Sequence, residues 1–345
     1  MMSKKIRTLI VDDSATMRAL LVKLLSIEPD IDVVGTAIDA NDARRLIKEL
    51  NPDVITLDIE MPGMCGLEFL EKLMRLRPMP VVIVSGLTRK GADTTAHALE
   101  LGAVDCYAKP SGGAGDLLSS DGGQLAELIR AAAQVKPRFH SQIVAATPPV
   151  VEVVRSAEVR LVAIGSSTGG VEALQVLLGS FPADCPPTVI VQHINGHFAE
   201  AVARRLDSSC APTVLLAESD LRLKPGHIYL APGNDRHLQV RGSSSFVSRL
   251  MPGDPVSGHR PSVDALFQSV AAAAGPHAVG IQLTGMGSDG AKGLLAMRQA
   301  GAHTIAQDEA TCTVFGMPRA AIALGAAVEV APLGAIAQRA LRKAA

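Results

Sequence analysis

The sequence IRTLIVDDS at residues 6–14 places a largely aliphatic run directly before two aspartates and a serine. Four similar runs follow within the first 110 residues, and amphipathic stretches of helical length separate them. The four runs are IDVVG (31–35), DVITLD (53–58), PVVIVS (80–85) and AVDCYAKP (103–110). Short apolar strands that alternate with helices are typical of a doubly wound parallel sheet. The first 110 residues therefore predict a five-stranded α/β domain.

Polar side chains stand at the ends of these runs. Asp12 and Asp13 follow the first run, Asp58 ends the third, Ser85 ends the fourth and Lys109 closes the fifth. Functional sites of open parallel sheets lie at the carboxyl ends of the strands, so these side chains are expected to converge. Carboxylate oxygens suit Mg²⁺, and a carboxylate can itself accept a phosphoryl group. A single aspartate at a strand end is most often an ordinary loop residue, so the interpretation depends on the whole set.

The motifs LIVDDS, LDIEMPGMCGLE, VIVSGLT and YAKP together resemble the receiver domain of two-component response regulators. The resemblance covers residues 5 to about 123 and implies a flavodoxin-like fold. It implies that Asp58 is the phosphoacceptor and that a histidine kinase is the phosphodonor. It further implies a Mg²⁺ ion held by Asp12, Asp13, Asp58 and the main-chain carbonyl of Glu60.

The same resemblance assigns the switch residues of the receiver. Lys109 would pair with the phosphate, while Ser85 and Tyr107 would reorient on phosphorylation. Cys65 departs from the family pattern, because receivers usually carry Asp or Asn before the glycine. We expect Cys65 to be a loop residue and Gly66 to absorb most of the change in the turn.

A second α/β pattern begins at Val159 and reaches Leu341. It is preceded by a helix-compatible stretch, QLAELIRAAAQV (124–135), and by a segment dense in Pro, Ser and Ala at 136–158, which predicts a linker. We expect a receiver domain at 1–123, a helix end and linker at 124–157, and a second doubly wound α/β domain at 158–345. Three short runs in the second domain predict an antiparallel excursion: HIYLAP (227–232), HLQVRG (237–242) and SFVSRL (245–250).

The segment IGSSTGG at residues 164–170 joins an aliphatic strand to an amphipathic helix. It lacks the glycine and lysine spacing of a phosphate or dinucleotide cradle. It does fit the G-x-S-x-G turn, in which small neighbours expose a nucleophilic serine, here Ser167. The alternative is that Ser166, Ser167 or Thr168 merely caps the helix that follows.

A serine nucleophile needs a base and an acid that orients this base. His193 follows the strand VIVQ, and Asp289 lies in a glycine-rich turn after another strand. His193 and His197 are four residues apart, a spacing that also occurs in zinc sites, but Gly196 and the lack of further ligands argue against one. The order Ser, His, Asp differs from the order Ser, acid, His of α/β-hydrolases.

The second domain resembles the catalytic domain of chemotaxis protein-glutamate methylesterases. The resemblance runs from about 158 to 342 and rests on these motifs: IGSSTGG, VQH, YLAPGNDRHL, RPSVDALFQS, LTGMGSDGAKGLLAMR and DEATCTVFGMPRAA. It implies that Ser167 attacks glutamate methyl esters on chemoreceptor cytoplasmic domains, with His193 as general base and Asp289 as orienting acid. The resemblance also implies that methanol is the product, that glutamine deamidation uses the same route, and that the esterase reaction needs no cofactor.

The resemblance leaves several positions in this domain less defined. Thr168, Met286 and Gly287 are candidates for the oxyanion hole or the substrate groove, and Ser262 is expected to cap a helix. Two departures are Ile194–His197, where the family often has Met-Pro, and Leu221, where a glycine is frequent. A regulatory hypothesis follows from the two domains: the unphosphorylated receiver covers the Ser167 cleft, and phosphorylation of Asp58 exposes it.

The composition disfavours several classes of protein. The chain has 345 residues, and its 33 Lys and Arg balance 34 Asp and Glu, which gives no bias toward nucleic acid or an anionic membrane. The longest charge-free stretch, between Asp264 and Asp289, is expected to be a buried helix and strand rather than a bilayer span. The N-terminal apolar run ends at two acids, unlike a signal peptide, and the five cysteines are scattered. We therefore expect a cytoplasmic monomer without nucleic-acid binding or membrane insertion.

Two other classes of function stay open at this point. A response regulator with a non-catalytic binding output, such as a transcription factor, would carry a basic recognition helix on a small C-terminal module. The near-neutral α/β pattern of residues 156–345 disfavours it. A degenerate esterase that acts as a phosphorylation-dependent scaffold is disfavoured because Ser167, His193 and Asp289 are all present.

Overall fold

The computed structural model describes residues 4–61, 65–109, 121–135, 159–233 and 235–341. The chain divides into two compact units, residues 1–146 and 147–345. Most of the predicted linker lies outside the described residues. In the described part of the chain, no helix combines the length and the apolar character that crossing a membrane requires.

The first unit is built on a parallel sheet with strand order β2-β1-β3-β4-β5 among its described residues. This order reverses direction between β1 and β3, as in a doubly wound flavodoxin-like fold, so the predicted fold of this half is confirmed. Its elements are β1 (Ile6–Val11), α1 (Ala15–Ser26), β2 (Ile31–Ala37), α2 (Ala40–Leu50), β3 (Val54–Asp58), α3 (Gly66–Leu76), β4 (Val81–Ser85), α4 (Arg89–Glu100), β5 (Asp105–Ala108) and α6 (Gln124–Ala133).

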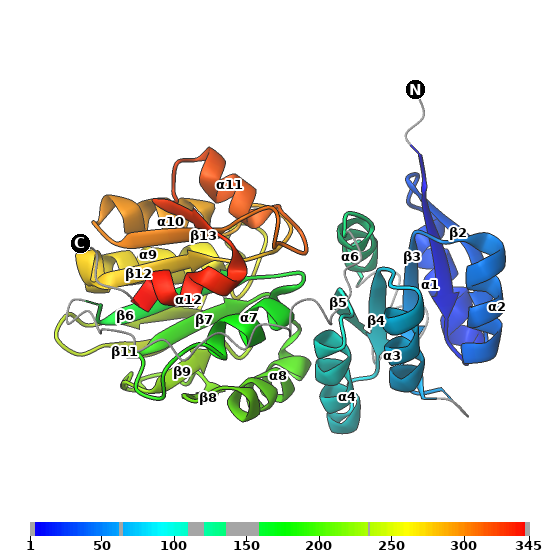
Figure 1. Ribbon diagram of the computed structural model, residues 1–345, viewed down its shortest axis with the longest axis horizontal. Coiled ribbons are helices and arrows are strands. Elements are labelled where there is room, and N and C mark those ends of the chain that lie inside the picture. The colour runs from blue at the N-terminus through cyan, green and yellow to red at the C-terminus, as the bar shows by residue number, and fades with distance from the viewer. Residues whose placement is uncertain (1–3, 62–64, 110–120, 136–158, 234, 342–345) are drawn as a thin grey trace. The chain divides into compact units, whose positions relative to one another are not determined.

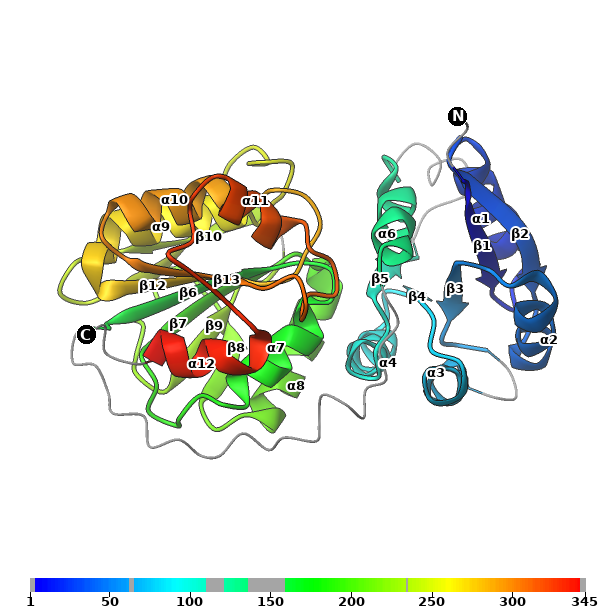
Figure 2. The ribbon, with the colours of Figure 1, turned by 45° about the horizontal axis from the view of Figure 1, so that its top comes forward.

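Helices cover both faces of this sheet, with α1 and α6 on one face and α2, α3 and α4 on the other (Figure 2). Leu125 and Ile129 of α6 are fully buried and pack with Leu21 of α1 and Val84 of β4 in one core cluster. Arg130 of α6 adds ion pairs to acidic residues of the α1–β2 connection. The domain boundary at residue 123 stays a prediction, and this packing favours a first domain that includes α6.

The second unit contains a seven-stranded sheet of order β14-β13-β12-β6-β7-β9-β8, parallel throughout its described strands. The direction of winding reverses between the neighbouring strands β6 and β12, which again gives a doubly wound fold. Its elements are β6 (Leu161–Ser166), α7 (Gly170–Leu178), β7 (Thr188–Gln192), α8 (Gly196–Ser209), β8 (Thr213–Leu216), β9 (His227–Leu230), β10 (Arg236–Arg241), β11 (Val247–Pro252), α9 (Val263–Ala274), the short 3₁₀ helix η2 (Gly275–His277), β12 (Ala278–Gln282), α10 (Ala291–Gln299), β13 (His303–Gln307), α11 (Met317–Ala323), β14 (Glu329–Ala331) and α12 (Leu333–Leu341).

The predicted antiparallel excursion is correct for two of its three runs. Strands β10 and β11 form an antiparallel pair in which Leu238 lies opposite Leu250. The first run, HIYLAP, was expected to belong to this pair, and that expectation is wrong. It forms β9, which lies between β7 and β8 and is parallel to both. Ile228, Tyr229 and Leu230 are all buried, as is typical of a parallel strand covered on both faces.

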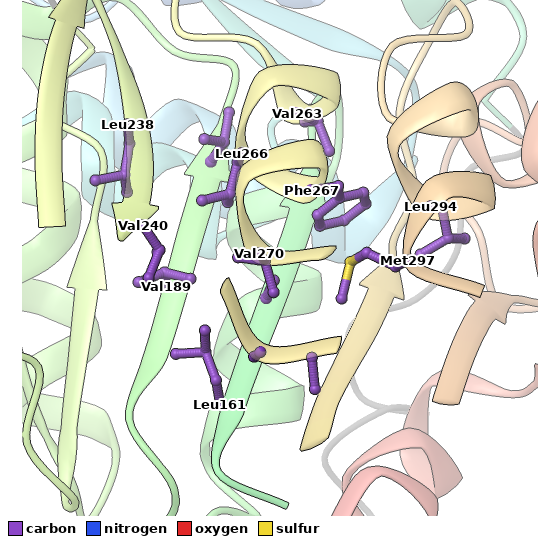
Figure 3. Packing of buried hydrophobic residues seen from close by; sticks show 14 of the residues in the cluster. Leu161, Val189, Leu238, Val240, Val263, Leu266, Phe267, Val270, Leu294 and Met297 are labelled. Atoms are coloured by element: carbon purple, nitrogen blue, oxygen red, sulfur yellow. The ribbon is translucent and has the colours of Figure 1, made fainter. Parts of the chain in front are cut away.

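One hydrophobic core cluster of the second unit lies between the sheet and the helices on one of its faces. Helices α9, α10 and α11 lie on one face, and α7, α8 and α12 lie on the other (Figures 1 and 2). In Figure 3, Leu266 and Val270 of α9 lie over the sheet strands, and the ring of Phe267 lies between α9 and α10, beside Met297. This packing places the N-terminus of α9 beside the carboxyl ends of β6, β7 and β12.

Candidate functional site

Three aspartates gather at the carboxyl edge of the first sheet. One carboxylate oxygen from each of Asp12, Asp13 and Asp58 lies within 4.8 Å of the other two. Asp12 and Asp58 are buried, whereas Asp13 is exposed. Such a set of oxygen donors, open to solvent on one side, fits Mg²⁺. Glu60 lies next to the cluster, because its amide donates a 3.0 Å hydrogen bond to Oδ1 of Asp58.

Lys109 contributes the positive charge of this cluster. Its Nζ lies 2.6 Å from Oδ2 of Asp58 and 2.9 Å from Oδ2 of Asp12. Burial acts to lower the pKa of the ammonium, but the hydrogen bonds to the two carboxylates outweigh it, and the pKa is raised. Burial raises the pKa of Asp12 against the opposing effect of Lys109, and the charge of Asp58 adds to the rise. The cluster therefore holds an excess of negative charge that a divalent cation would neutralise.

Ser85 and Tyr107 occupy different surroundings. Ser85 is buried, its carbonyl accepts a 2.7 Å hydrogen bond from the Lys109 amide, and its hydroxyl lies 3.4 Å from the carbonyl oxygen of Gly91. Tyr107 is buried in the core cluster on the α6 side, and its hydroxyl donates a 2.7 Å hydrogen bond to Asp121. Burial and Asp121 raise the pKa of Tyr107. The structure thus brings Ser85 next to Lys109 and ties Tyr107 to Asp121 instead.

Cys65 precedes helix α3 and leaves this helix without a side-chain cap. Its Sγ lies 3.8 Å from the carbonyl oxygen of Ile59, and its φ of −58° is ordinary for any residue. Gly66 allows the close approach instead, because a Cβ there would lie 2.4 Å from the carbonyl oxygen of Asp58. The glycine therefore brings the start of α3 against the end of β3, beside the cluster.

The second site begins at the turn between β6 and α7. Ser167 follows the last residue of β6 and is half-buried, and Gly169 adopts a φ of 73°. A Cβ on Gly170 would lie 2.0 Å from Oε1 of Gln192, so only glycine fits there. Gly169 rather than a serine stands at the cap position of α7 and provides no side-chain hydrogen bond. The cap position of α7 is therefore occupied by Gly169 and by none of Ser166, Ser167 and Thr168.

His193 directly follows β7, the strand next to the one that Ser167 follows. Ser166 of β6 is paired with Gln192 of β7, and the His193 amide donates a 2.9 Å hydrogen bond to the Ser166 carbonyl. Ser167 and His193 therefore leave adjacent parallel strands side by side. Nε2 of His193 lies 2.8 Å from Oδ2 of Asp289, while Nδ1 is buried and has no hydrogen-bond partner among the described residues.

Asp289 is held at the N-terminus of helix α9. Its Oδ1 accepts hydrogen bonds from the Ser262 hydroxyl (2.8 Å) and the Asp264 amide (2.9 Å), and its Oδ2 accepts one from the Val263 amide (2.8 Å). Burial acts to raise the pKa of this carboxyl, but His193, the Asp264 amide and Ser262 outweigh it, and the pKa is lowered. The helix N-terminus therefore keeps Asp289 ionised beside the imidazole.

The loop after β12 passes directly beside Ser167. The amide of Ser167 donates to the Thr284 carbonyl (3.0 Å), and a Cβ on Gly285 would lie 2.7 Å from the Cβ of Ser167. The Gly285 amide is already bonded to the Val314 carbonyl. Met286 and Gly287, which come next, are half-buried and exposed. This path keeps both residues near the nucleophile turn.

The sequence did not predict the contacts that three side chains make in this site. Gln192 bridges the two turns, because its Nε2 donates to the carbonyls of Ser167 (2.9 Å) and His193 (3.0 Å). Ser262 caps α9 as predicted, but it also bonds Asp289. His259 stacks on His193, with ring centroids 3.8 Å apart. The sequence held a signal for the role of Gln192, because this polar residue ends an otherwise apolar strand directly before His193, the predicted base.

The zinc interpretation of His193 and His197 finds no partner residues. In the ranges that the structure describes, the one group of three or more His, Cys, Asp or Glu spaced for a metal is Asp12, Asp13 and Asp58. His197 instead lines an open groove of about 710 Å³ together with Asn195, Gly233, Asp235 and Arg260, among others. Asn195, Gly196 and His197 of the departure at Ile194–His197 thus form one wall of this groove.

Comparison with known proteins covers both units. The CheB methylesterase family model matches residues 162–340, and the response regulator receiver domain model matches residues 8–119. The chain is 54% identical over 344 residues to protein-glutamate methylesterase/protein-glutamine glutaminase 1 of Rhizobium johnstonii, which covers 100% of this chain and 98% of that protein. It is 53% identical over 337 residues to protein-glutamate methylesterase/protein-glutamine glutaminase 1 of Caulobacter vibrioides. This alignment covers 97% of this chain and 96% of that protein.

A solved structure gives the same result for the second unit. The CheB methylesterase catalytic domain of Thermotoga maritima is 37% identical and aligns with a TM-score of 0.52 over 53% of this chain and 97% of that domain. The fold class and both resemblances predicted from the sequence are thereby confirmed. The chain belongs to the CheB methylesterase family and carries a response regulator receiver domain ahead of its esterase domain.

Proposed function

We propose that this chain is a phosphorylation-activated serine hydrolase that demethylates glutamate methyl esters, and deamidates glutamines, on chemoreceptors. The observation that carries the proposal is the 2.8 Å contact between His193 and the buried, helix-bound Asp289, next to the strand that leads into Ser167. Family membership provides the substrate class, because the relatives are protein-glutamate methylesterases and protein-glutamine glutaminases.

In the proposed reaction, Ser167 attacks the γ-carbonyl carbon of the ester. His193 takes the hydroxyl proton, and Asp289 stabilises the imidazolium that forms. As the bond from the carbonyl carbon to the methoxy oxygen breaks, His193 protonates that oxygen, and methanol leaves. Water hydrolyses the acyl-enzyme and restores Ser167 and the glutamate carboxylate. Nε2 of His193 contacts Asp289, so Nδ1, which has no hydrogen-bond partner among the described residues, is the nitrogen that takes the proton of the Ser167 hydroxyl. Glutamine reacts by the same route with ammonia as the leaving group.

The oxyanion of the intermediate needs hydrogen-bond donors near Ser167. We assign this role to Thr168 and to the segment of Met286 and Gly287, which follows the close contact between Gly285 and Ser167. In other serine hydrolases the loss of one such donor lowers kcat by roughly 10²–10³-fold. Met286 would also face the substrate groove.

The receiver provides the control. We assign Asp58 as the phosphoacceptor, with Lys109 pairing to the phosphoryl group and Ser85 and Tyr107 as switch residues. Asp12, Asp13, Asp58 and the main-chain carbonyl of Glu60 would hold Mg²⁺, which offsets the charge of the carboxylates and the phosphoryl oxygens when bound. A histidine kinase is the proposed phosphodonor, and chemoreceptor cytoplasmic domains are the proposed substrates. A cytoplasmic location and a monomeric state are part of the proposal.

The experiment measures methanol released from a methyl-labelled receptor cytoplasmic domain, with and without a small phosphodonor and Mg²⁺. The native chain should release methanol faster with the phosphodonor, and Asp58→Asn should remove this stimulation. Ser167→Ala should abolish release, whereas Ser180→Ala, a matched control away from the turn, should not change it. Release that persists in Ser167→Ala would exclude the nucleophile, and no release by the native chain would favour a scaffold.

A non-catalytic binding output is not favoured, because the CheB methylesterase match extends over residues 162–340. We keep the domain division as a proposal: a receiver at 1–123, a connecting segment at 124–157 and an esterase domain at 158–345. The packing of α6 on the first core argues for moving the first boundary past Ala133.

A further inference from the structure

The imidazole of His193 is contacted on its face as well as on its edge. The ring of His259 lies parallel to it, with an interplanar angle of 12° and a centroid distance of 3.8 Å. The two histidines are 66 positions apart in the sequence, and His259 belongs to the loop between β11 and α9. The proposed catalytic roles of Ser167, His193 and Asp289 do not use this second ring.

A tight turn holds His259 in place. Val256 and His259 exchange two main-chain hydrogen bonds of 3.1 and 3.0 Å across Ser257 and Gly258. Both central residues have positive φ, 52° and 82°, as a two-residue hairpin turn requires. The hydroxyl of Ser257 also donates a 2.8 Å hydrogen bond to the buried carboxylate of Asp264. The backbone of His259 is therefore anchored to helix α9.

The same loop orients both groups that contact the predicted base. Three residues after His259, Ser262 caps α9 and donates to Oδ1 of Asp289. Asp289 fixes one ring nitrogen of His193, but a single hydrogen bond leaves the ring plane free to tilt about it. A flat partner against the face removes that freedom. The hydrogen bond of Asp289 at the ring edge and the stack of His259 on the ring face together determine the direction in which the buried Nδ1 of His193 points.

We propose that His259 is a positioning residue, which holds the plane of the His193 ring so that Nδ1 stays aligned with the Ser167 hydroxyl. This inference rests on the proposed esterase function of the same site. His259 itself transfers no proton in this scheme.

The electrostatic surroundings of His259 agree with that role. Burial lowers the pKa of His259 to about 4, charge on His193 acts in the same direction, and Asp289 acts in the opposite one. Its own loop adds Asp254 and Arg260, which are exposed. With a pKa of about 4, His259 is neutral above about pH 5, so it does not oppose the positive charge that forms on His193 during the reaction.

The test compares His259→Phe, which keeps a flat ring, with His259→Ala, which removes it. Both are measured in the full chain activated with the phosphodonor. Because small misplacements of reacting groups cost up to about 10²-fold, His259→Ala should lower kcat roughly 10–100-fold and change KM less than about 2-fold. His259→Phe should keep kcat within about 3-fold of native, with the acid limb of its pH–rate profile unchanged. His227→Ala is the matched control and should behave as native. His227 is the first residue of β9 and so lies at the end of this strand opposite to the carboxyl ends that form the site.

Each alternative outcome overturns the inference. Native kcat in His259→Ala would show that the stack is unnecessary. Equal loss in both variants, or a displaced acid limb in His259→Phe, would show that the imidazole itself transfers a proton. Circular dichroism melting of both variants separates loss of activity from loss of fold.

A second readout separates this inference from the proposed function. The rate at which a fluorophosphonate labels Ser167 reports activation of the serine without any receptor substrate. The order native, His259→Phe, His259→Ala in labelling rate would support positioning even if receptor demethylation were absent. Equal labelling rates in all three would overturn it.

Discussion

The side-chain amide of Gln192 donates a 2.9 Å hydrogen bond to the main-chain oxygen of Ser167. Its second proton goes to the main-chain oxygen of His193 at 3.0 Å, and its Oε1 accepts a 2.6 Å hydrogen bond from Ser166. Gln192 is 3% exposed, so water does not compete for these contacts. One buried amide therefore sets the spacing between the predicted nucleophile and the predicted base.

Replacing Gln192 by Met keeps the length of the side chain and removes its polar atoms. Two carbonyls and one hydroxyl lose a buried partner, so the free energy of unfolding should fall by about 1–3 kcal/mol, as measured by urea unfolding. Methanol release should fall at least about 10-fold, because the two turns lose their common tie. Gln299→Met, an exposed glutamine on α10, is the control. Unchanged activity in Gln192→Met would show that the strands alone fix the spacing.

Gly285→Ala should displace the predicted nucleophile. The added Cβ would lie 2.7 Å from the Cβ of Ser167 and 2.3 Å from Sδ of Met317, so the loop has to shift. We expect a fluorophosphonate to label Ser167 at least about 10-fold more slowly in this variant. Gly334→Ala in α12 meets no atom within 4 Å and should keep the native labelling rate with equal or slightly higher stability. Native labelling in Gly285→Ala would contradict the close approach.

Asp289→Asn should change both catalysis and the pH dependence of stability. The pKa of Asp289 is lowered in the folded chain, so its ionised form stabilises the fold above the unfolded pKa, and this contribution is lost as the pH falls through the folded pKa. The native chain should therefore melt above Asp289→Asn near neutral pH, and the difference should shrink below about pH 4. Calorimetric melting across this range measures it. A difference in melting temperature that is constant with pH would contradict the assignment. The same Asp289→Asn substitution should lower kcat about 10³–10⁴-fold.

Asp12→Asn should stabilise the receiver while it impairs phosphorylation. The pKa of Asp12 is raised in the folded chain, so its ionisation costs stability once the pH is above the unfolded pKa. Removing the charge should therefore raise the melting temperature at pH 7 without Mg²⁺, while Lys109 keeps its contact with Asp58. Asp13→Asn, at an exposed position, should leave the melting temperature nearly unchanged. A lower melting temperature for Asp12→Asn would show that the Lys109 pair outweighs burial.

Cys65→Asp should stabilise helix α3. Cys65 provides no side-chain hydrogen bond to the helix start, and an aspartate at this position can accept one from the first turn. The free energy of unfolding should rise by about 1 kcal/mol, measured by urea unfolding of the receiver transition. Cys65→Ala lacks the acceptor and should show no such gain. Equal stability of the two variants would contradict the missing cap.

The sequence was sufficient for residues that follow directly from strand order. Asp12, Asp58 and Lys109 were predicted together because parallel strands end at a common edge, and the structure brings them within hydrogen-bond or ion-pair distance. Ser167, His193 and Asp289 follow their strands for the same reason. Strand β9 was misassigned because a four-residue apolar run carries little information on the direction of its partners.

The remaining contacts depend on how loops fold over the sheet. Ser262 was predicted as a cap from local sequence, but its bond to Asp289 joins residues 27 positions apart. His259 stands in a loop whose turn is visible in the sequence, whereas the stack on His193 depends on the packing of that loop against α9. Neither relationship has a spacing pattern that a single sequence could reveal.

Helix α9 links the stability of the second unit to its activity. The amides and cap at its first turn hold the carboxylate of Asp289, and its apolar face fills the core of the second unit. A chain in which this helix has melted loses the ionised acid and the hydrophobic core in the same event. Heat inactivation and unfolding should therefore coincide. A partly unfolded molecule should lose esterase activity and should not persist as an unregulated esterase.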